Sequence, residues 1–308
     1  MQPIIEVRNL RKTYGDVVAV QDVSFDVHPG EIVAILGRNG AGKTPTVEAL
    51  AGLRTADGGS IRVLGQDPQA HPERIREHVG IQLQQAKLPP KITVDEAMRL
   101  YASFYSEPAD IEELLGMLGL VQHRRKKFDG LSGGLQQRLS IALALVGNPR
   151  IAILDELTTG LDPQARRETW ELVEKVRRSG VTILLVTHFM DEAEHLSDRV
   201  IVIDAGRVVA DGAPAALTAG DEQRRSFRMT TPERIDVAAL RALPEVTEVV
   251  ELDGNELAVT GTRKVLPAVV LELARHDVVP DDIATTGRNL EDLFLDLVGT
   301  PISEGALT

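Results

Sequence analysis

The sequence predicts an α/β fold with a largely parallel sheet, followed by a smaller α+β domain. Three short apolar runs, at residues 31–36, 151–154 and 181–187, are typical of strands buried on both faces. Patterns of helical period separate these runs. The clearest pattern predicts a helix that has Asp162 as its N-cap, Pro163 at its first position and Gly180 just past its end. Alternating strands and helices predict a parallel sheet covered by helices.

A second domain is expected beyond residue 220. Residues 212–221 are rich in small residues and proline, which predicts a linker. The patterns that follow predict strand 226–229, helix 235–243, strands 247–252 and 256–260 joined by a hairpin turn at 253–255, helix 265–275, strand 282–285 and helix 290–298. This βαββαβ order predicts a ferredoxin-like domain over residues 221–308.

Composition limits the classes of function. The chain has 308 residues, which is enough for one large and one small domain. It has no cysteine, so disulfides and cysteine-based metal sites are excluded. The absence of cysteine fits a reducing cytoplasm. No apolar run reaches the length of a membrane span and no signal peptide is evident, so any membrane path is expected from a partner. The net charge of −12 is most strongly acidic beyond residue 220, and nucleic acid is therefore not expected as a partner.

A G-x-x-x-x-G-K-T motif lies between a predicted strand and a predicted helix. In such a loop, glycines let backbone N–H groups turn towards phosphates, and the helix N-terminus adds partial positive charge. We expect Lys43 to reach the β- and γ-phosphates and the Thr44 hydroxyl to bind Mg²⁺. The alternative is an ordinary glycine-rich turn. The motif consists of Gly37, Arg38, Asn39, Gly40, Ala41, Gly42, Lys43 and Thr44.

Two acids follow the apolar run at residues 151–154. Asp155 is placed to hold Mg²⁺ through water, and Glu156 to polarise the attacking water. Two adjacent acids at a strand end are more often a solvated edge. However, a predicted phosphate loop lies upstream. The two acids are therefore a second, separate indication of a phosphoryl-transfer mechanism.

The segment Leu131-Ser-Gly-Gly-Leu-Gln-Gln-Arg138 resembles the signature of ATP-binding cassette (ABC) proteins, and it lies between the loop and the acids, as in that family. The resemblance implies a P-loop NTPase cassette over residues 1–220, with an antiparallel β edge and a helical subdomain at about 86–148. It also implies that Ser132, Gly133 and Gly134 face the ATP held by the other subunit of a head-to-tail homodimer. The alternative is that Ser132 simply caps a helix.

Four further positions match the family one by one. Tyr14 matches the aromatic residue that stacks on adenine, although a tyrosine at a strand edge is as common. Gln84 matches the glutamine that contacts Mg²⁺ and senses the membrane partner, with Gln82 and Gln85 as neighbouring candidates. Asp162 matches the residue that crosses the dimer interface, and it is also a helix N-cap. His188 matches the histidine that contacts the γ-phosphate, where a lone histidine would usually be structural.

The last predicted helix lies in a segment, Arg288 to Val298, that resembles the tail of bacterial drug-export ATPases of the daunorubicin-resistance type. This resemblance implies a separate transmembrane permease, a peripheral location on the cytoplasmic face of the membrane, and efflux of drugs or other small molecules. From the residues alone, the segment is an amphipathic helix whose apolar face could close the core of the small domain. Residues 89–105, which are rich in proline and aromatic residues, either contact the permease or fill the helical subdomain.

Three positions depart from the family. Pro45 replaces the usual Ser or Thr beside the α-phosphate, Leu135 replaces a glutamine of the signature, and Leu157 replaces the proline after the acidic pair. These departures favour, as an alternative, a nucleotide-dependent regulator with little turnover. A soluble ABC ATPase that acts on ribosomes or DNA is a further alternative, but such proteins typically have paired cassettes, a coiled-coil insertion or a basic surface. A GTPase is the weakest option because the chain has no N-K-x-D motif.

Overall fold

The computed structural model describes residues 2–82, 88–218, 224–232, 235, 237–252, 255–286 and 289–299. The chain divides into two compact units, Met1–Pro214 and Ala215–Thr300. The division lies slightly before the expected boundary at residue 220. Residues 214–218 form a short helix, α8 (Pro214–Thr218), where the composition predicted an irregular linker. A run of small residues with one proline can start a helix, because proline is well tolerated in the first helical turn.

The first unit contains one sheet of nine strands in the order β4-β1-β2-β9-β8-β3-β7-β6-β5. Strands β3, β5, β6, β7 and β8 pair in parallel, whereas β1, β2 and β4 form an antiparallel edge. The predicted α/β cassette with a largely parallel sheet and an antiparallel edge is therefore confirmed. The strands are β1 (Ile5–Tyr14), β2 (Val17–Val27), β3 (Ile32–Leu36), β4 (Gly58–Val63), β5 (Val79–Gln82), β6 (Ile151–Asp155), β7 (Thr182–Thr187), β8 (Arg199–Asp204) and β9 (Arg207–Gly212).

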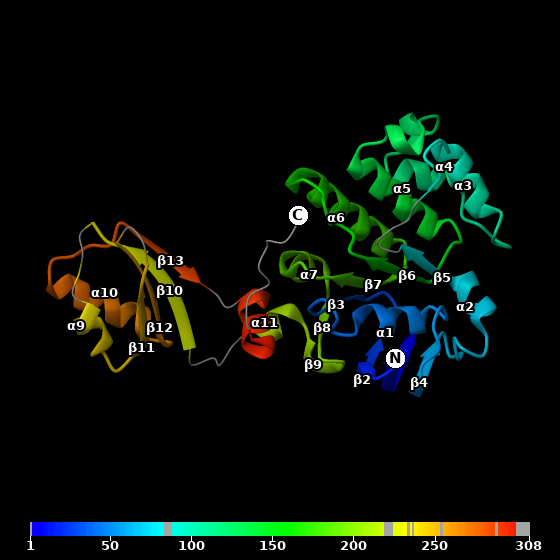
Figure 1. Cartoon of the computed structure of the whole chain (residues 1–308). Helices are drawn as coiled ribbons and strands as arrows, with labels where there is room; N and C mark the ends of the chain where they lie inside the picture. Colours follow the sequence, from blue (N-terminus) through cyan, green and yellow to red (C-terminus); the bar gives the residue numbers. More distant parts are fainter. Residues whose placement is uncertain are drawn as a thin grey trace. The chain divides into compact units, whose positions relative to one another are not determined.

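Helices cover both faces of the parallel strands. Figure 1 shows α1 between these strands and the antiparallel edge, and α5 and α6 on the other face. Every residue of β3, β6 and β7 is buried, as expected for strands covered on both faces. Helices α3 and α4 both contact α5, and all three lie within residues 86–148, where a helical subdomain was expected. The helices of the first unit are α1 (Lys43–Leu50), α2 (Pro72–His78), α3 (Val94–Ala102), α4 (Ile111–Met117), α5 (Gly133–Leu145), α6 (Pro163–Arg178) and α7 (Met190–Leu196).

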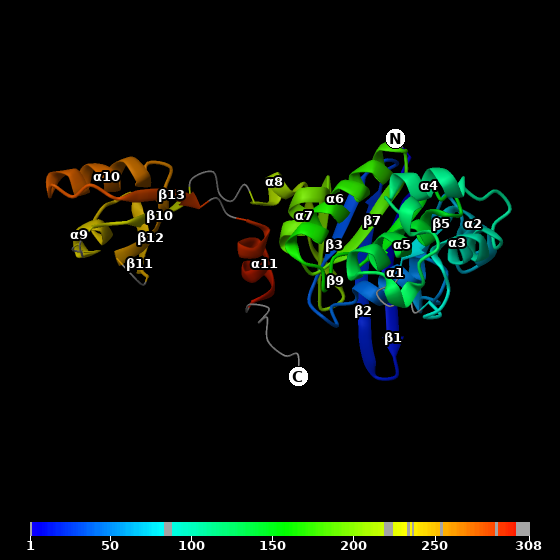
Figure 2. The same ribbon diagram turned by 90° about the horizontal axis from the view of Figure 1, so that it is seen from above.

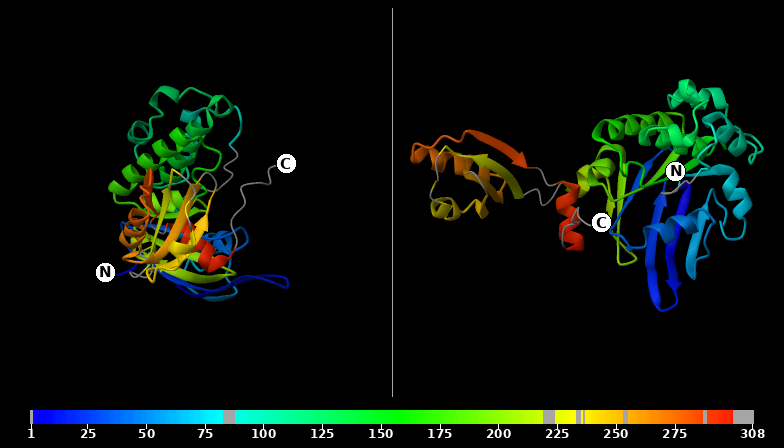
Figure 3. Two further views of the ribbon diagram at one scale, coloured as in Figure 1. Left: turned by 90° about the vertical axis from the view of Figure 1, so that its left-hand side faces the viewer. Right: turned by 45° about the horizontal axis from the view of Figure 1, so that its top comes forward.

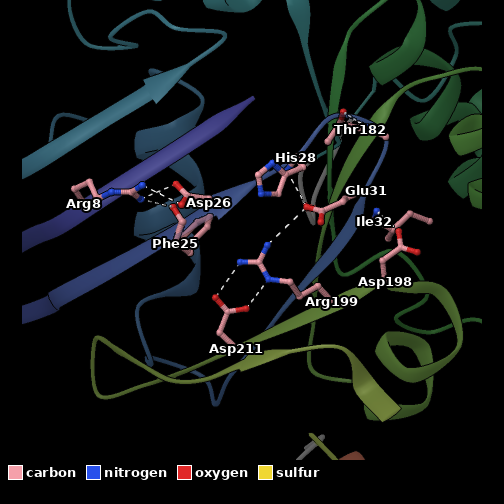
Figure 4. A network of polar contacts seen from close by, with 11 residues as sticks. Arg8, Phe25, Asp26, His28, Glu31, Ile32, Thr182, Asp198, Arg199 and Asp211 are labelled. Atoms are coloured by element: carbon pink, nitrogen blue, oxygen red, sulfur yellow. Dashed lines mark hydrogen bonds and ion pairs between the residues drawn. The ribbon is translucent and has the colours of Figure 1, made fainter. Parts of the chain in front are cut away.

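A polar network fixes the last strand of the first unit (Figure 4). Arg199 on β8 donates from Nε to Oδ1 of Asp211 on β9 (2.6 Å) and from Nη2 to Oδ2 (2.9 Å). Its Nη1 lies 3.7 Å from Oε2 of Glu31, which accepts the backbone N–H of His28 (2.7 Å). Bidentate pairs of this kind are among the stronger charged contacts. The network therefore holds β9 in place immediately before the chain enters the second unit.

The second unit has the element order β10-α9-β11-β12-α10-β13 followed by α11, and its sheet order is β11-β12-β10-β13. Helices α9 and α10 cover this sheet (Figures 2 and 3). Their apolar residues share a core with Phe227, Val249 and Val259. The expected hairpin turn lies partly outside the described residues. The elements are β10 (Arg224–Thr230), α9 (Val237–Arg241), β11 (Val246–Glu251), β12 (Glu256–Thr262), α10 (Val265–Arg275), β13 (Asp282–Thr286) and α11 (Leu290–Val298).

Helix α11 begins with a capping box, in which Asn289 and Asp292 exchange side-chain to backbone hydrogen bonds. Its apolar residues Leu290, Leu293 and Phe294 are buried, but they do not belong to the apolar core that α9 and α10 form with the sheet. The alternative interpretation of this helix, in which it closes the core of the small domain, stays a prediction. Among the described residues, no helix has the length and hydropathy of a membrane span.

Candidate functional site

The phosphate loop connects the end of β3 to the start of α1. Two of its glycines cannot be replaced without backbone movement: a Cβ on Gly37 would lie 2.4 Å from the carbonyl oxygen of Ile203, and one on Gly42 would lie 2.6 Å from that of Ala19. Gly42 also has a φ of 105°, which side chains disfavour. The loop is thus wedged between β2 and β8, and its first-turn N–H groups at the start of α1 are available for an anion.

Lys43 lies inside this loop. It is 7% exposed, and its Nζ donates to the carbonyl oxygens of Gly37 (2.6 Å) and Arg38 (3.0 Å). Burial lowers the pKa of Lys43, and the carboxylates of Glu156 and Asp155 oppose this shift. The ammonium group is therefore held at the loop by backbone acceptors, from which it can move to phosphate oxygens.

Asp155 ends β6 and is 8% exposed. Its pKa is raised to about 6, mainly by burial and then by the charge of Glu156, while Lys43 opposes the rise. A bound divalent cation would favour the ionised form. The hydroxyl of Thr44 and the carboxylate of Asp155 are the oxygen donors that Mg²⁺ prefers, so the residues present fit this ion.

Glu156 has a backbone φ of 50°, which is unusual for a residue with a side chain. Its N–H donates to the carbonyl oxygen of Val186 on β7 (2.8 Å), and its Oε1 lies 3.5 Å from Nδ1 of His188. Leu157, at the position of the family proline, is fully buried. The loop that begins at Glu156 is therefore held against the end of β7, and Glu156 and His188 meet although 31 residues separate them.

Tyr14 ends β1 and its side chain is 40% exposed. Two cations face its ring: Nζ of Lys12 lies 5.6 Å from the ring centroid, and the guanidinium carbon of Arg54 lies 5.2 Å from it. Arg54 is also paired with Glu48 of α1 (Nε to Oε2, 2.5 Å). Cation–π attraction thus connects the ring to the helix that follows the phosphate loop.

The signature residues form a second group. Ser132 precedes α5, and its side chain makes no capping hydrogen bond. Together with Gly133, Gly134 and Asp162 it lines a shallow hollow of about 400 Å³. None of the described residues that line this hollow comes from the phosphate loop. The carboxylate of Asp162 accepts the N–H groups of Gln164 (3.0 Å) and Ala165 (2.9 Å), so Asp162 caps α6 in this structure.

The predicted site residues are therefore arranged in two separate groups. One contains Lys43, Asp155, Glu156 and His188, and the other contains the signature residues and Asp162. Gln84 and Gln85 lie outside the described residues, so the role of Gln84 stays a prediction. Gln82 ends β5 and is buried.

Two residues were missed by the sequence analysis. Thr46 is buried, and its Oγ1 donates to the carbonyl oxygen of Gly42 (2.8 Å) at the first turn of α1. Its proximity to the phosphate motif could have drawn attention to it. Glu192, on α7, is fully buried beside the loop that follows Glu156. No motif marks it, because its importance depends on contacts between distant parts of the chain.

Comparison with known proteins shows the family of the chain. The ABC transporter family matches residues 20–159. Nod factor export ATP-binding protein I of Ralstonia nicotianae is 36% identical over 305 residues, which cover 96% of this chain and 94% of that protein. A solved ATP-binding subunit of an ABC transporter is 31% identical, with a TM-score of 0.63 over 70% of this chain and 91% of that chain. A bacterial ABC transporter cassette solved as a dimer is 28% identical, with a TM-score of 0.61 over 68% of this chain and 98% of its own. The chain therefore belongs to the ABC transporter family and is an ATP-binding, ATP-hydrolysing cassette of that family.

Proposed function

We propose that this chain is the ATPase subunit of an exporter that moves a drug or another small molecule through a separate membrane permease. The observation that carries the catalytic assignment is the meeting of Lys43, Asp155, Glu156 and His188 at the end of the parallel sheet. The export assignment is supported by relatives whose name describes export, such as the protein from Ralstonia nicotianae.

The residues of the first group act together with Tyr14, Thr44 and Gln84, and each has a distinct part in hydrolysis. Lys43 and the backbone N–H groups of the loop bind the β- and γ-phosphates of ATP, and Tyr14 stacks on adenine. Thr44 and Asp155, together with Gln84, would hold Mg²⁺, which would supply positive charge to the phosphates. Glu156 orients and polarises the attacking water, while His188 contacts the γ-phosphate. Positioning and charge stabilisation account for most of the rate in such reactions.

The second group completes the site of another copy of the chain. Ser132, Gly133 and Gly134 lie at the start of α5, where free N–H groups favour a phosphate. None of the described residues that line this hollow comes from the phosphate loop, which supports a role of the signature at the ATP of another copy. A head-to-tail homodimer would place each signature over the partner's phosphate loop and enclose two ATP molecules.

Glu156→Gln tests this proposal. The variant removes the negative charge that polarises water but keeps the shape of the side chain. We expect nearly normal ATP binding, a dimer that persists in ATP, and turnover lowered by roughly 10²–10⁴-fold. Glu171→Gln, an exposed glutamate on α6, is the matched control and should behave as the wild type. ATP turnover and size-exclusion chromatography in ATP are the measurements, and a Glu156→Gln variant with normal turnover would contradict the assignment.

A further inference from the structure

The carboxyl group of Glu192 is buried between three elements. Glu192 lies on α7, which packs against α6 and β7, and its side chain is fully buried. Burial raises its pKa, whereas the side chains of Thr187, Thr158 and Trp170 favour the ionised form. These side chains therefore face the carboxyl group from the end of β7, from the loop after Glu156 and from α6.

Several polar atoms of this cluster lack a hydrogen bond of normal geometry. Both carboxyl oxygens of Glu192, Oγ1 of Thr158 and Nε1 of Trp170 are buried and unpaired within the part of the chain that the structure describes. A buried polar group without a hydrogen-bond partner lowers the stability of the folded state. Small movements of the loop would pair donors with the two acceptor oxygens, since the groups already surround them. An apolar side chain could fill the same space without an unpaired polar group. The presence of a carboxyl at this position is therefore explained by the polar side chains that face it.

The two segments that face Glu192 both lead to the catalytic group. Thr158 lies two residues after Glu156, and Thr187 directly precedes His188. The backbone of Glu156 is left-handed (φ 50°), and for a residue with a side chain such a conformation persists only where its surroundings fix it. Leu157 and Thr158 are both fully buried, so the conformation of this loop depends on the side chains that pack against it, such as Glu192.

We propose that Glu192 is a positioning residue for ATP hydrolysis, whose carboxyl group holds the loop of Glu156 and the end of β7 in the relative placement that brings Glu156 to His188. Glu192 touches neither ATP nor the attacking water. It acts through Thr158 on one side and through Thr187 on the other. The inference rests on the proposed role of Glu156 in polarising water.

A small displacement of Glu156 is enough to be measured. A misplacement of about 1 Å in a catalytic group can lower the rate by about 10²-fold. Loss of the Glu192 carboxyl should therefore reduce kcat while leaving the KM for ATP nearly unchanged, because Lys43 and the phosphate loop are anchored elsewhere. A residue that only stabilises the fold would lower the fraction of folded protein and leave kcat per folded molecule as it was.

The test compares four single variants of the full chain. Glu192→Ala and Thr158→Val remove the two sides of one contact, and we expect each to lower kcat by about 10–100-fold with less than about a threefold change in KM. Glu192→Gln keeps the shape and one acceptor oxygen, and its NH2 group can donate to a threonine hydroxyl, so it should restore most of kcat. Glu194→Ala, an exposed position of the same helix, is the control. Steady-state ATP hydrolysis is normalised to folded protein by circular dichroism.

Two results would overturn the inference. One is a normal kcat in folded Glu192→Ala and Thr158→Val, and the other is a loss in Glu192→Ala that Glu192→Gln does not restore. If Glu192→Ala does not fold, Thr158→Val and Glu192→Gln decide the question. The double variant Glu156→Gln with Glu192→Ala separates this inference from the proposed function. A kcat of the double variant close to that of Glu156→Gln alone supports action of Glu192 through Glu156. A Glu156→Gln protein with normal kcat would instead contradict the proposed role of Glu156 itself.

Discussion

Nδ1 of His188 lies 3.5 Å from Oε1 of Glu156, and the two side chains meet at adjacent strand ends. His188 follows β7 directly, and Glu156 follows β6, which pairs with β7 in parallel. Parallel pairing brings the carboxyl ends of both strands to the same edge of the sheet. The ring of His188 is further fixed by Phe189, whose ring centroid is 4.1 Å away.

This contact predicts the behaviour of His188→Ala. The variant removes the partner of Glu156 and the proposed γ-phosphate contact, but it leaves the phosphate loop intact. Turnover should fall by about 10²-fold, and ATP affinity should change far less. Steady-state hydrolysis and calorimetric titration of ATP measure the two quantities. His276→Ala, an exposed histidine of the second unit, is the control, and equal turnover in the two variants would contradict a role of His188 in the chemical step.

Asp155 predicts how the stability of the nucleotide-free protein depends on pH. Its pKa in the folded protein is about 6, above the ordinary value of 3.8. The folded protein therefore binds this proton more tightly than the unfolded chain, and ionisation of Asp155 costs stability. This cost is absent below about pH 4, grows between about pH 4 and 6, and is complete above pH 6.

Asp155→Asn removes that cost. At pH 7 the variant without nucleotide or Mg²⁺ should be more stable than the wild type by up to about 3 kcal/mol, and the difference should vanish near pH 4. Thermal unfolding followed by circular dichroism at several pH values measures it. The same variant should lose ATP turnover because it removes the Mg²⁺-binding carboxylate. A stability difference that stays constant with pH would show that the buried charge of Asp155 is not its cause.

The sequence predicted those parts of the fold and site that depend on neighbouring residues. The helix after Asp162 begins and ends as expected, because its N-cap, its proline and its terminal glycine are local signals. The phosphate loop was recognised because one short motif contains all of it. Glu192 was not predicted, because its environment comes from residues 158, 170 and 187, which only the fold brings together. What covers the buried face of α11 could not be predicted, since an amphipathic pattern does not specify its partner.

The second unit is expected to be dispensable for ATP binding. No phosphate motif lies beyond His188, and residues Ala215–Thr300 form a compact unit of their own. A chain truncated after residue 220 should fold and bind ATP with an affinity close to that of the full chain, as measured by calorimetry. Assembly with the permease should change instead. If the truncated chain does not fold, α11 is part of the core of the cassette, and the proposed domain boundary at residue 220 is wrong.

The membrane partner is expected to contact the segment around residues 88–105. Its helix α3 exposes Leu100 (46%), and Phe104, just beyond that helix, is 65% exposed, which is unusual for large apolar side chains. Because the chain has no cysteine, single introduced cysteines report specific contacts. Lys91→Cys should crosslink to the permease, and Val279→Cys, an exposed position of the second unit, should not. Capture from position 279 alone would assign the partner surface to the second unit.

Pro45 is expected to weaken the ATP site without abolishing it. With Gly42 as N-cap, α1 starts at Lys43, and the first backbone N–H with a partner inside the helix is that of Thr46, which donates to Gly42 (3.2 Å). The N–H that Pro45 lacks therefore breaks no helical hydrogen bond, which explains why the helix tolerates proline here. The same N–H would otherwise be free to bind the α-phosphate, and the usual hydroxyl is missing with it.

Pro45→Thr should therefore tighten the binding of Mg-ATP and raise turnover. A hydrogen bond to a charged group is worth about 1.5–3 kcal/mol, so regaining one of them should increase affinity by about tenfold or more. Proline also restricts the backbone of the preceding residue, Thr44, so the substitution should improve the placement of the proposed Mg²⁺ ligand. Pro72→Thr is the matched control, because Pro72 starts α2 outside the site. Calorimetry at fixed Mg²⁺ is the measurement, and equal affinities of the wild type and Pro45→Thr would mean that the remaining N–H groups of the loop bind the α-phosphate fully without residue 45.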